Sequence, residues 1–143
     1  MSFPKLISVD SGNIYLLEYF LENLEEAKES FRYFNKRPLS IINSHLCTFL
    51  LIAENCQPIA YGHLDKEDDI VWLGIAVNSK SQGKGIGKLM MSHLIRFAQN
   101  NNINNIQLSV DIDNVKARNL YEKMGFICSS SFKKYALYNL SFN

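Results

Sequence analysis

Short apolar runs and helically spaced apolar residues alternate along this chain, and together they predict a mixed α/β fold. Apolar runs bounded by polar or turn-forming residues are typical of strands. Apolar residues that recur about every three or four positions are typical of a helix with one buried face. The expected strands span residues 6–9, 48–53, 59–64, 70–77, 106–110, 126–128 and part of 133–140, and the expected helices span residues 14–29, 86–97 and 115–124.

The order of these elements predicts the topology of the sheet. Three successive strands between residues 48 and 77 are joined by short polar turns and are expected to form an antiparallel meander. The strand at 70–77, the helix from residue 86 and the strand at 106–110 make a strand–helix–strand unit. Such a unit implies a parallel pair with a right-handed crossover. We therefore expect a mixed, mostly antiparallel sheet flanked by helices.

A glycine-rich loop follows the strand at 70–77 and begins the next helix. Its three glycines let the main chain approach a ligand closely and adopt positive φ. The start of a helix offers free N–H groups and partial positive charge, which suit a pyrophosphate. The spacing fits neither a Walker loop nor the dinucleotide fingerprint, and a glycine-rich turn without a ligand is the alternative. The loop consists of Gln82, Gly83, Lys84, Gly85, Ile86 and Gly87, and Lys88 adds a further cation beside it.

A second motif lies at residues 114–126. Asn114 is a natural N-cap and Gly125 a natural stop for a short helix. From the residues alone, Tyr121 is either a core aromatic or a hydroxyl donor in a site, and Asn114 is either a simple cap or a ligand contact. The apolar stripe of this helix comprises Ala117, Leu120, Tyr121 and Met124.

Read together, the motifs are Q-x-x-G-x-G and N-x-x-A-x-x-L-Y-x-x-x-G-F, and from about Cys47 onward the chain resembles the GNAT superfamily of N-acetyltransferases. The resemblance implies a fold in which the strands before and after the crossover splay apart to hold pantetheine. It also implies acetyl-CoA as cosubstrate and no metal. The cofactor-binding residues it implies are Ile75, Ala76 and Val77 through their backbone, together with Gln82, Gly83, Lys84, Gly85, Ile86, Gly87, Lys88, Asn114 and Tyr121.

The resemblance further implies direct transfer, in which a neutral amine attacks the acetyl carbonyl and Tyr121 protonates the departing CoA thiolate. Many relatives carry a Glu on the strand before the glycine loop, but residues 70–77 contain none. The first candidate for the base is therefore His63, because histidine has an ordinary pKa near 6.5. Asp65 and Glu67, acting through water, are the next candidates. His63 as a surface residue at a strand end is the alternative interpretation.

In that fold the segment after the first helix usually borders the acceptor site, and here it is both aromatic and basic. Arginine pairs with phosphate, and aromatic rings stack on a sugar or a base. The expected acceptor is therefore an aminosugar carried on a nucleotide or another small amine. The alternatives are a peptide or protein amine, a non-catalytic CoA sensor, and aromatic residues that only pack the first helix. The expected substrate-binding residues are Arg32, Tyr33, Phe34 and Arg37.

Composition sets the remaining expectations. A chain of 143 residues with 47% apolar and 20% charged residues fits one domain, residues 1–143. A net charge of +1 argues against a nucleic-acid partner. Residues 1–5 lack the layout of a signal peptide and no apolar run is long enough to span a membrane, so we expect a cytoplasmic protein without a membrane partner. Cys47, Cys56 and Cys128 are expected to be reduced and buried. The resemblance allows a homodimer.

Overall fold

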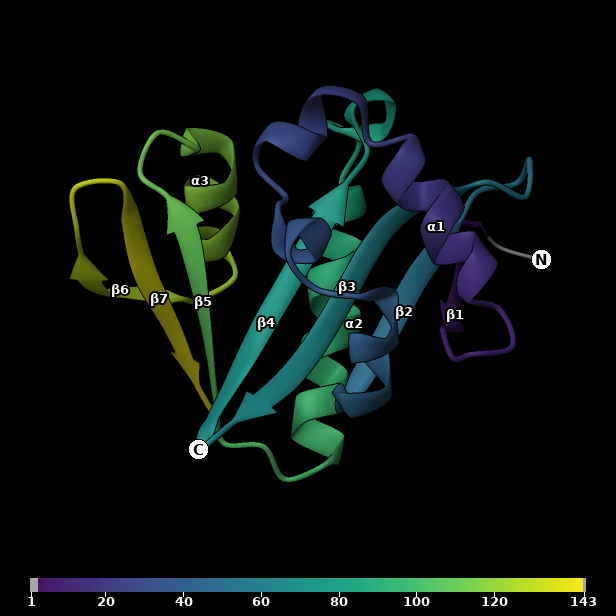
Figure 1. The fold of residues 1–143 in the computed structure, drawn as a ribbon. Helices are drawn as coiled ribbons and strands as arrows, with labels where there is room; N and C mark the ends of the chain where they lie inside the picture. Colours follow the sequence, from purple (N-terminus) through teal and green to yellow (C-terminus); the bar gives the residue numbers. More distant parts are fainter. Residues whose placement is uncertain (1–2, 143) are drawn as a thin grey trace.

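The computed structural model describes residues 3–142, which form a seven-stranded sheet flanked by helices (Figure 1). Met1 and Ser2, part of the segment used to assess a signal peptide, lie outside these residues. The strands are β1 Lys5–Ser8, β2 Cys47–Ile52, β3 Pro58–Glu67, β4 Ile70–Val77, β5 Asn105–Asp111, β6 Ile127–Ser131 and β7 Tyr135–Ser141. The α-helices are α1 Ile14–Glu22, α2 Ile86–Asn100 and α3 Val115–Lys123, and the 3₁₀ helices are η1 Glu25–Glu29, η2 Tyr33–Asn35, η3 Leu39–Ser44 and η4 Ser79–Ser81.

The sheet is divided at one strand pair. Its order is β1-β2-β3-β4-β5-β7-β6, and the pairs are antiparallel except for β4 and β5, which are parallel. β4 pairs with β3 along its whole length, but with β5 only where Trp72 lies opposite Gln107. The two strands then diverge (Figure 1). The predicted meander, parallel crossover and splayed pair are thus confirmed.

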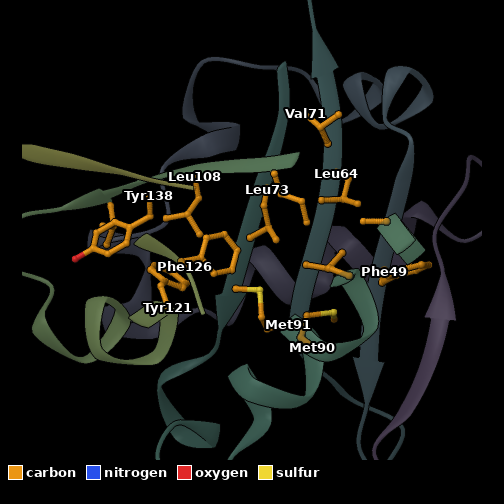
Figure 2. Close-up of a cluster of buried hydrophobic side chains, with 14 of the residues drawn as sticks. Phe49, Leu64, Val71, Leu73, Met90, Met91, Leu108, Tyr121, Phe126 and Tyr138 are labelled. Carbon is orange, nitrogen blue, oxygen red and sulfur yellow. The ribbon is translucent and has the colours of Figure 1, made fainter. Parts of the chain in front are cut away.

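The two faces of the sheet bury separate apolar clusters. On one face α1 covers β3, where Phe20 stacks on Tyr61. On the other face α2 packs against β3 and β4 through Met90 and Met91 (Figure 2). This second cluster continues past the divergence to Tyr121 and its neighbours on α3, β5 and β7, so α3 is held against the part of the sheet beyond β4.

Several local expectations were wrong. The helix expected to reach residue 29 ends at Glu22, because Glu25 adopts a left-handed φ of 59° and the chain continues as 3₁₀ turns. Cys47 is buried as expected, but Cys56 and Cys128 are exposed. Cys56 occupies the hairpin turn, and Cys128 lies on the exposed edge strand β6. Across residues 3–142, no helix has the length and apolar character needed to cross a membrane.

Candidate active site

A cavity of about 820 Å³ opens where β4 and β5 diverge. Its wall includes the C-terminal half of β4, the glycine loop, the end of β5 and the start of α3. It also includes the end of β3 and the irregular segment after α1. The cavity therefore joins the two motifs to the aromatic and basic segment, which are far apart in the sequence.

The glycine loop turns toward the cavity through two left-handed residues. Gly83 has φ of 78° and Gly85 has φ of 79°, a region that residues with a side chain rarely adopt. Gly85 is the N-cap of α2 and supplies no side-chain hydrogen bond, so the first N–H groups of α2 are available to an anion. Gly87 has a different role: a Cβ there would lie 3.3 Å from Cδ2 of Leu120, so this glycine lets α2 approach α3.

The loop is fixed to β4 by a side-chain contact, since Nε2 of Gln82 donates to the carbonyl oxygen of Val77 at 3.1 Å. Most of the predicted cofactor residues line the cavity. Lys84 does not reach the wall, whereas Lys88 and Lys116 do. Lys116 was not predicted as a site residue, because it reaches the cavity only when α3 packs beside the glycine loop. The lining residues from the prediction are Ile75, Ala76, Val77, Gln82, Gly83, Gly85, Ile86, Gly87, Lys88, Asn114 and Tyr121.

Helix α3 begins as its sequence predicts. Oδ1 of Asn114 accepts from the backbone N–H of Ala117 at 3.3 Å, which is an N-cap contact. On the other side of the helix the Tyr138 hydroxyl donates to Oε2 of Glu122 at 2.6 Å and accepts from Nε of Arg118 at 3.1 Å. These contacts tie α3 to β7, and they therefore set the position of the neighbouring residue Tyr121.

Tyr121 is 7% exposed and lines the cavity. Its ring packs beside those of Phe126 and Tyr138, at centroid distances of 5.9 and 6.2 Å (Figure 2). Burial raises the pKa of Tyr121 above its ordinary value of 10. The hydroxyl is thus protonated at neutral pH and can act as a proton donor.

Strand β3 presents a row of polar groups on the α1 side of the sheet. Tyr61, His63, Asp65 and Glu67 occupy alternate positions, and alternate residues of a strand share a face. The last three line the cavity. The sequence already contained this alternation, which could have shown that the three candidate bases share one face with Tyr61.

His63 is not at the surface, as one interpretation of the sequence held, but 2% exposed. Its Nδ1 lies 2.6 Å from the Tyr61 hydroxyl, and its ring lies 4.3 Å from that of His45 and 4.4 Å from that of Tyr33, between centroids. Burial, then the charges at His45 and Arg37, lower the pKa of His63 well below 6.5. The imidazole is neutral, but it is a much weaker base than an ordinary histidine.

Gly74 makes room for this imidazole. It lies opposite His63 in the β3–β4 register, and a Cβ at position 74 would fall 2.3 Å from Cε1 of His63. Real Cβ atoms do not approach another atom this closely. The imidazole therefore occupies the space that a side chain at position 74 would need. The sequence could not identify this role, because it depends on the register of two strands.

Asp65 is the next group along the row. It is 7% exposed, and burial raises its pKa above 3.8, opposed by the charge of Arg37 and a backbone hydrogen bond from Lys66. A carboxylate with a raised pKa accepts a proton more readily than an exposed one. Asp65 thus combines a place in the cavity wall with increased basicity.

The basic segment divides its two arginines between different roles. Arg32 makes two hydrogen bonds to the carboxylate of Asp111, at 3.0 and 2.9 Å, and this ion pair links the segment after α1 to the end of β5. The guanidinium of Arg37 lies 4.2 Å from the centroid of the Tyr33 ring, and its Nη1 donates to the carbonyl oxygen of Tyr33. Both arginines and Tyr33 line the cavity. Phe34 instead packs against Phe31 and Tyr61, in line with the packing interpretation.

Two wall residues had no signal in the sequence pattern. Trp72, the single tryptophan of the chain, lies beside the point where β4 leaves β5, and Asp111 meets Arg32 across a separation of 79 residues. Across residues 3–142 there is no group of three or more His, Cys, Asp or Glu placed to hold a metal ion.

Comparisons with known proteins agree with the fold. Residues 13–126, more than half of the chain, match the model of the Acetyltransferase (GNAT) family. A 67-residue stretch is 36% identical to the L-amino acid N-acetyltransferase AaaT of Escherichia coli strain K12, and it spans 46% of this chain and 41% of that relative.

Two solved structures share the architecture at low sequence identity. The PaiA N-acetyltransferase of Thermoplasma acidophilum, solved in complex with coenzyme A, has a TM-score of 0.79 at 16% identity, over 99% of this chain and all of the other. The ribosomal-protein-S18-alanine N-acetyltransferase of Escherichia coli has a TM-score of 0.73 at 17% identity, over 96% and 92% of the two chains.

Proposed function

We infer the function of this chain from its family, because it belongs to the Acetyltransferase (GNAT) family. We propose that it is an acetyl-CoA-dependent N-acetyltransferase that moves an acetyl group directly to a primary amine. The observation that carries this proposal is the splayed strand pair. β4 pairs with β5 only at Trp72, so the backbone groups on the β5 side of the following β4 residues face the cavity without a strand partner, while β3 pairs the other side.

Those backbone groups suit the amides of pantetheine. Ile75, Ala76 and Val77 line the cavity where β4 has left β5, and their main chain can hydrogen bond to an extended ligand as a missing strand would. The pyrophosphate would then lie at the N-terminus of α2, against the amides that follow Gly85. In this arrangement, we expect the acetyl group to lie between Tyr121 and the polar row on β3, which line the same cavity.

The chemistry divides between the two sides of the cavity. Tyr121 donates a proton to the departing CoA thiolate, a role that its raised pKa permits at neutral pH. Asp65, rather than His63, takes the excess proton from the amine, directly or through water. Burial raises the pKa of Asp65 and strengthens it as a base, whereas burial lowers the pKa of His63 and weakens it. Glu67 lies farther along the same row and provides a second carboxylate for a cationic amine.

The charges of the acceptor side favour a small amine that also carries one anionic group. Arg32 is occupied by Asp111, and Arg37 has no ion-pair partner within residues 3–142. One available guanidinium beside two carboxylates matches an ammonium and a carboxylate on one molecule. The sequence match to an L-amino acid N-acetyltransferase agrees with this choice. A nucleotide-linked aminosugar would place a diphosphate here, and only Arg37 would be available to bind it.

An amine panel tests the proposal. Wild-type protein with acetyl-CoA would be incubated with amino acids, nucleotide-linked aminosugars, polyamines and short peptides. Loss of the thioester would be followed together with product mass, because the exposed Cys56 and Cys128 would react with thiol reagents. We expect transfer to amino acids or similar zwitterions. Transfer to a peptide would instead support a protein substrate, and binding of acetyl-CoA without transfer would support a sensor and contradict the enzyme proposal.

A further inference from the structure

The hydrogen bond between Tyr61 and His63 determines what His63 presents to the cavity. Tyr61 is fully buried, and within residues 3–142 the partner of its hydroxyl is Nδ1 of His63, at 2.6 Å. Burial raises the pKa of Tyr61 well above 10, so the hydroxyl keeps its proton. This proton needs an acceptor, because a buried donor without a partner is destabilising.

The tautomer of His63 follows from this requirement. If the Tyr61 hydroxyl donates to Nδ1, that nitrogen cannot also carry a proton in the neutral ring, and the proton lies on Nε2. The opposite tautomer would make Nδ1–H donate to the Tyr61 oxygen and leave the phenolic O–H unsatisfied. The first arrangement gives a partner both to the Tyr61 hydroxyl and to Nδ1 of His63. It leaves Nε2–H as the group that His63 can donate to a ligand in the cavity, which His63 lines.

The packing around the ring keeps it in place. Gly74 leaves the space above β4 in which the imidazole lies, and the rings of Tyr33 in η2 and His45 at the end of η3 pack against it. The groups in contact with His63 are Tyr61, Tyr33 and His45, the charge of Arg37 also acts on it, and Asp65 lies two residues along the same face. None of the contacting groups is an anion at neutral pH, so no contact within residues 3–142 stabilises a protonated imidazole.

We propose that His63 is a catalytic hydrogen-bond donor, whose neutral Nε2–H stabilises the oxygen of the acetyl group during transfer. Tyr61 and Gly74 are the positioning residues that hold it in this form. The proposal rests on the acetyltransferase function proposed above. It assigns His63 to electrophilic assistance, in place of the general-base role that the sequence favoured.

The step balances without a further reactant. The amine lone pair forms the new C–N bond, and the carbonyl π electrons move to the oxygen, which accepts the hydrogen bond from Nε2–H while His63 keeps its proton. The intermediate collapses, the C–S bond breaks and its electron pair leaves on sulfur, which Tyr121 protonates. Before the attack, Asp65 takes the excess proton of the ammonium and passes it to solvent; after the attack, it takes the second proton, which the amine nitrogen releases. Solvent then reprotonates Tyr121 and accepts the proton from Asp65.

A pair of substitutions distinguishes a donor from a base. His63→Gln places an amide N–H near the position of Nε2 but cannot accept the proton of an amine, whereas His63→Ala removes both functions. We expect kcat to fall by about 10²–10³ in His63→Ala, the range for loss of an oxyanion donor, and by less than about tenfold in His63→Gln. Equal losses in the two variants, with unchanged melting temperatures, would overturn the donor role.

A second measurement does not depend on activity. Nitrogen chemical shifts of the imidazoles in this chain report which ring nitrogen is protonated, and His93 provides an internal comparison. We expect the Nε2–H tautomer for His63 in wild type and a mixture of tautomers in Tyr61→Phe, which keeps the ring but removes the hydroxyl. An Nδ1–H tautomer in wild type would refute the inference. An absence of transfer to every amine, with the Nε2–H tautomer present, would refute the enzyme proposal instead.

Discussion

The two sides of the cavity are built in different ways. The cofactor side comes from two continuous segments, the end of β4 with the glycine loop, and α3. Each is held by a local contact, Gln82 with Val77 in the first and the Asn114 cap in the second. The acceptor side is assembled from β3, the middle of β4, the end of β5 and the irregular segment after α1, joined by contacts such as Arg32 with Asp111. We infer that substitutions on the cofactor side affect local conformation and acetyl-CoA, whereas those on the acceptor side act through neighbours distant in sequence.

The largest effect is expected at Tyr121, where the two sides meet. Tyr121→Phe should keep the ring packing against Phe126 and Tyr138 and remove the proton donor. General acids contribute about 10²–10⁴ in rate, so kcat should fall within that range while acetyl-CoA affinity changes little. Steady-state kinetics and calorimetric titration measure the two quantities. Wild-type kcat under conditions where chemistry limits turnover would exclude Tyr121 as the acid.

Asp65→Asn tests the acceptor side next. The amide keeps the shape of Asp65 but cannot take a proton, so kcat/KM for the amine at neutral pH should fall by about 10²-fold, the lower end of the range for general acid–base catalysis. The defect should shrink as the pH rises toward the pKa of the amine, because more of the amine is then already neutral. The pH dependence of kcat/KM in the two proteins measures this. A defect that stays constant with pH would assign Asp65 to binding rather than to proton transfer.

Gly85→Val tests whether the cofactor side depends on local conformation. Valine is strained at the φ of 79°, by roughly 1–2 kcal/mol or more, and its side chain would enter the open space beside the loop. We expect acetyl-CoA affinity to fall at least about tenfold, measured by quenching of the single tryptophan, Trp72.

Gly85→Asn is the matched control, because asparagine tolerates the left-handed region. Weak binding in both variants would show that a side chain blocks the pyrophosphate. Weak binding in the valine variant alone would assign the effect to backbone conformation. Full affinity in a folded Gly85→Val protein would remove the loop from the cofactor site.

The smallest effects are expected from substitution of the two arginines, and they show whether the arginine paired with Asp111 and the other arginine of the acceptor side have different roles. Arg37→Ala should raise the acceptor KM by about five- to tenfold and leave the acetyl-CoA KM unchanged, since loss of uniform binding has this kinetic form. Arg32→Ala should change the acceptor KM less, because its guanidinium is already paired with Asp111. If Arg32→Ala has the larger effect, the ion pair opens for the substrate and an acceptor with more anionic charge is favoured.

The sequence determined the parts of this protein that depend on neighbours along the chain. The left-handed Gly83 and Gly85, the Asn114 cap and the strand–helix–strand crossover follow from local backbone preferences and from the spacing of apolar residues, and each is present. The helix after residue 13 was predicted too long, because the apolar spacing continues through Leu24 while the backbone reverses at Glu25.

Only the tertiary structure decided the acceptor side. Gly74 became important because the β3–β4 register places it opposite His63, and a shift of one residue would remove the glycine from that position. The pairing of Arg32 with Asp111 and the burial that lowers the pKa of His63 likewise depend on which segments meet in space. Burial and charge depend on which residues surround a group in the folded protein, so the sequence identified His63 and Arg32 as candidates but could not assign their roles.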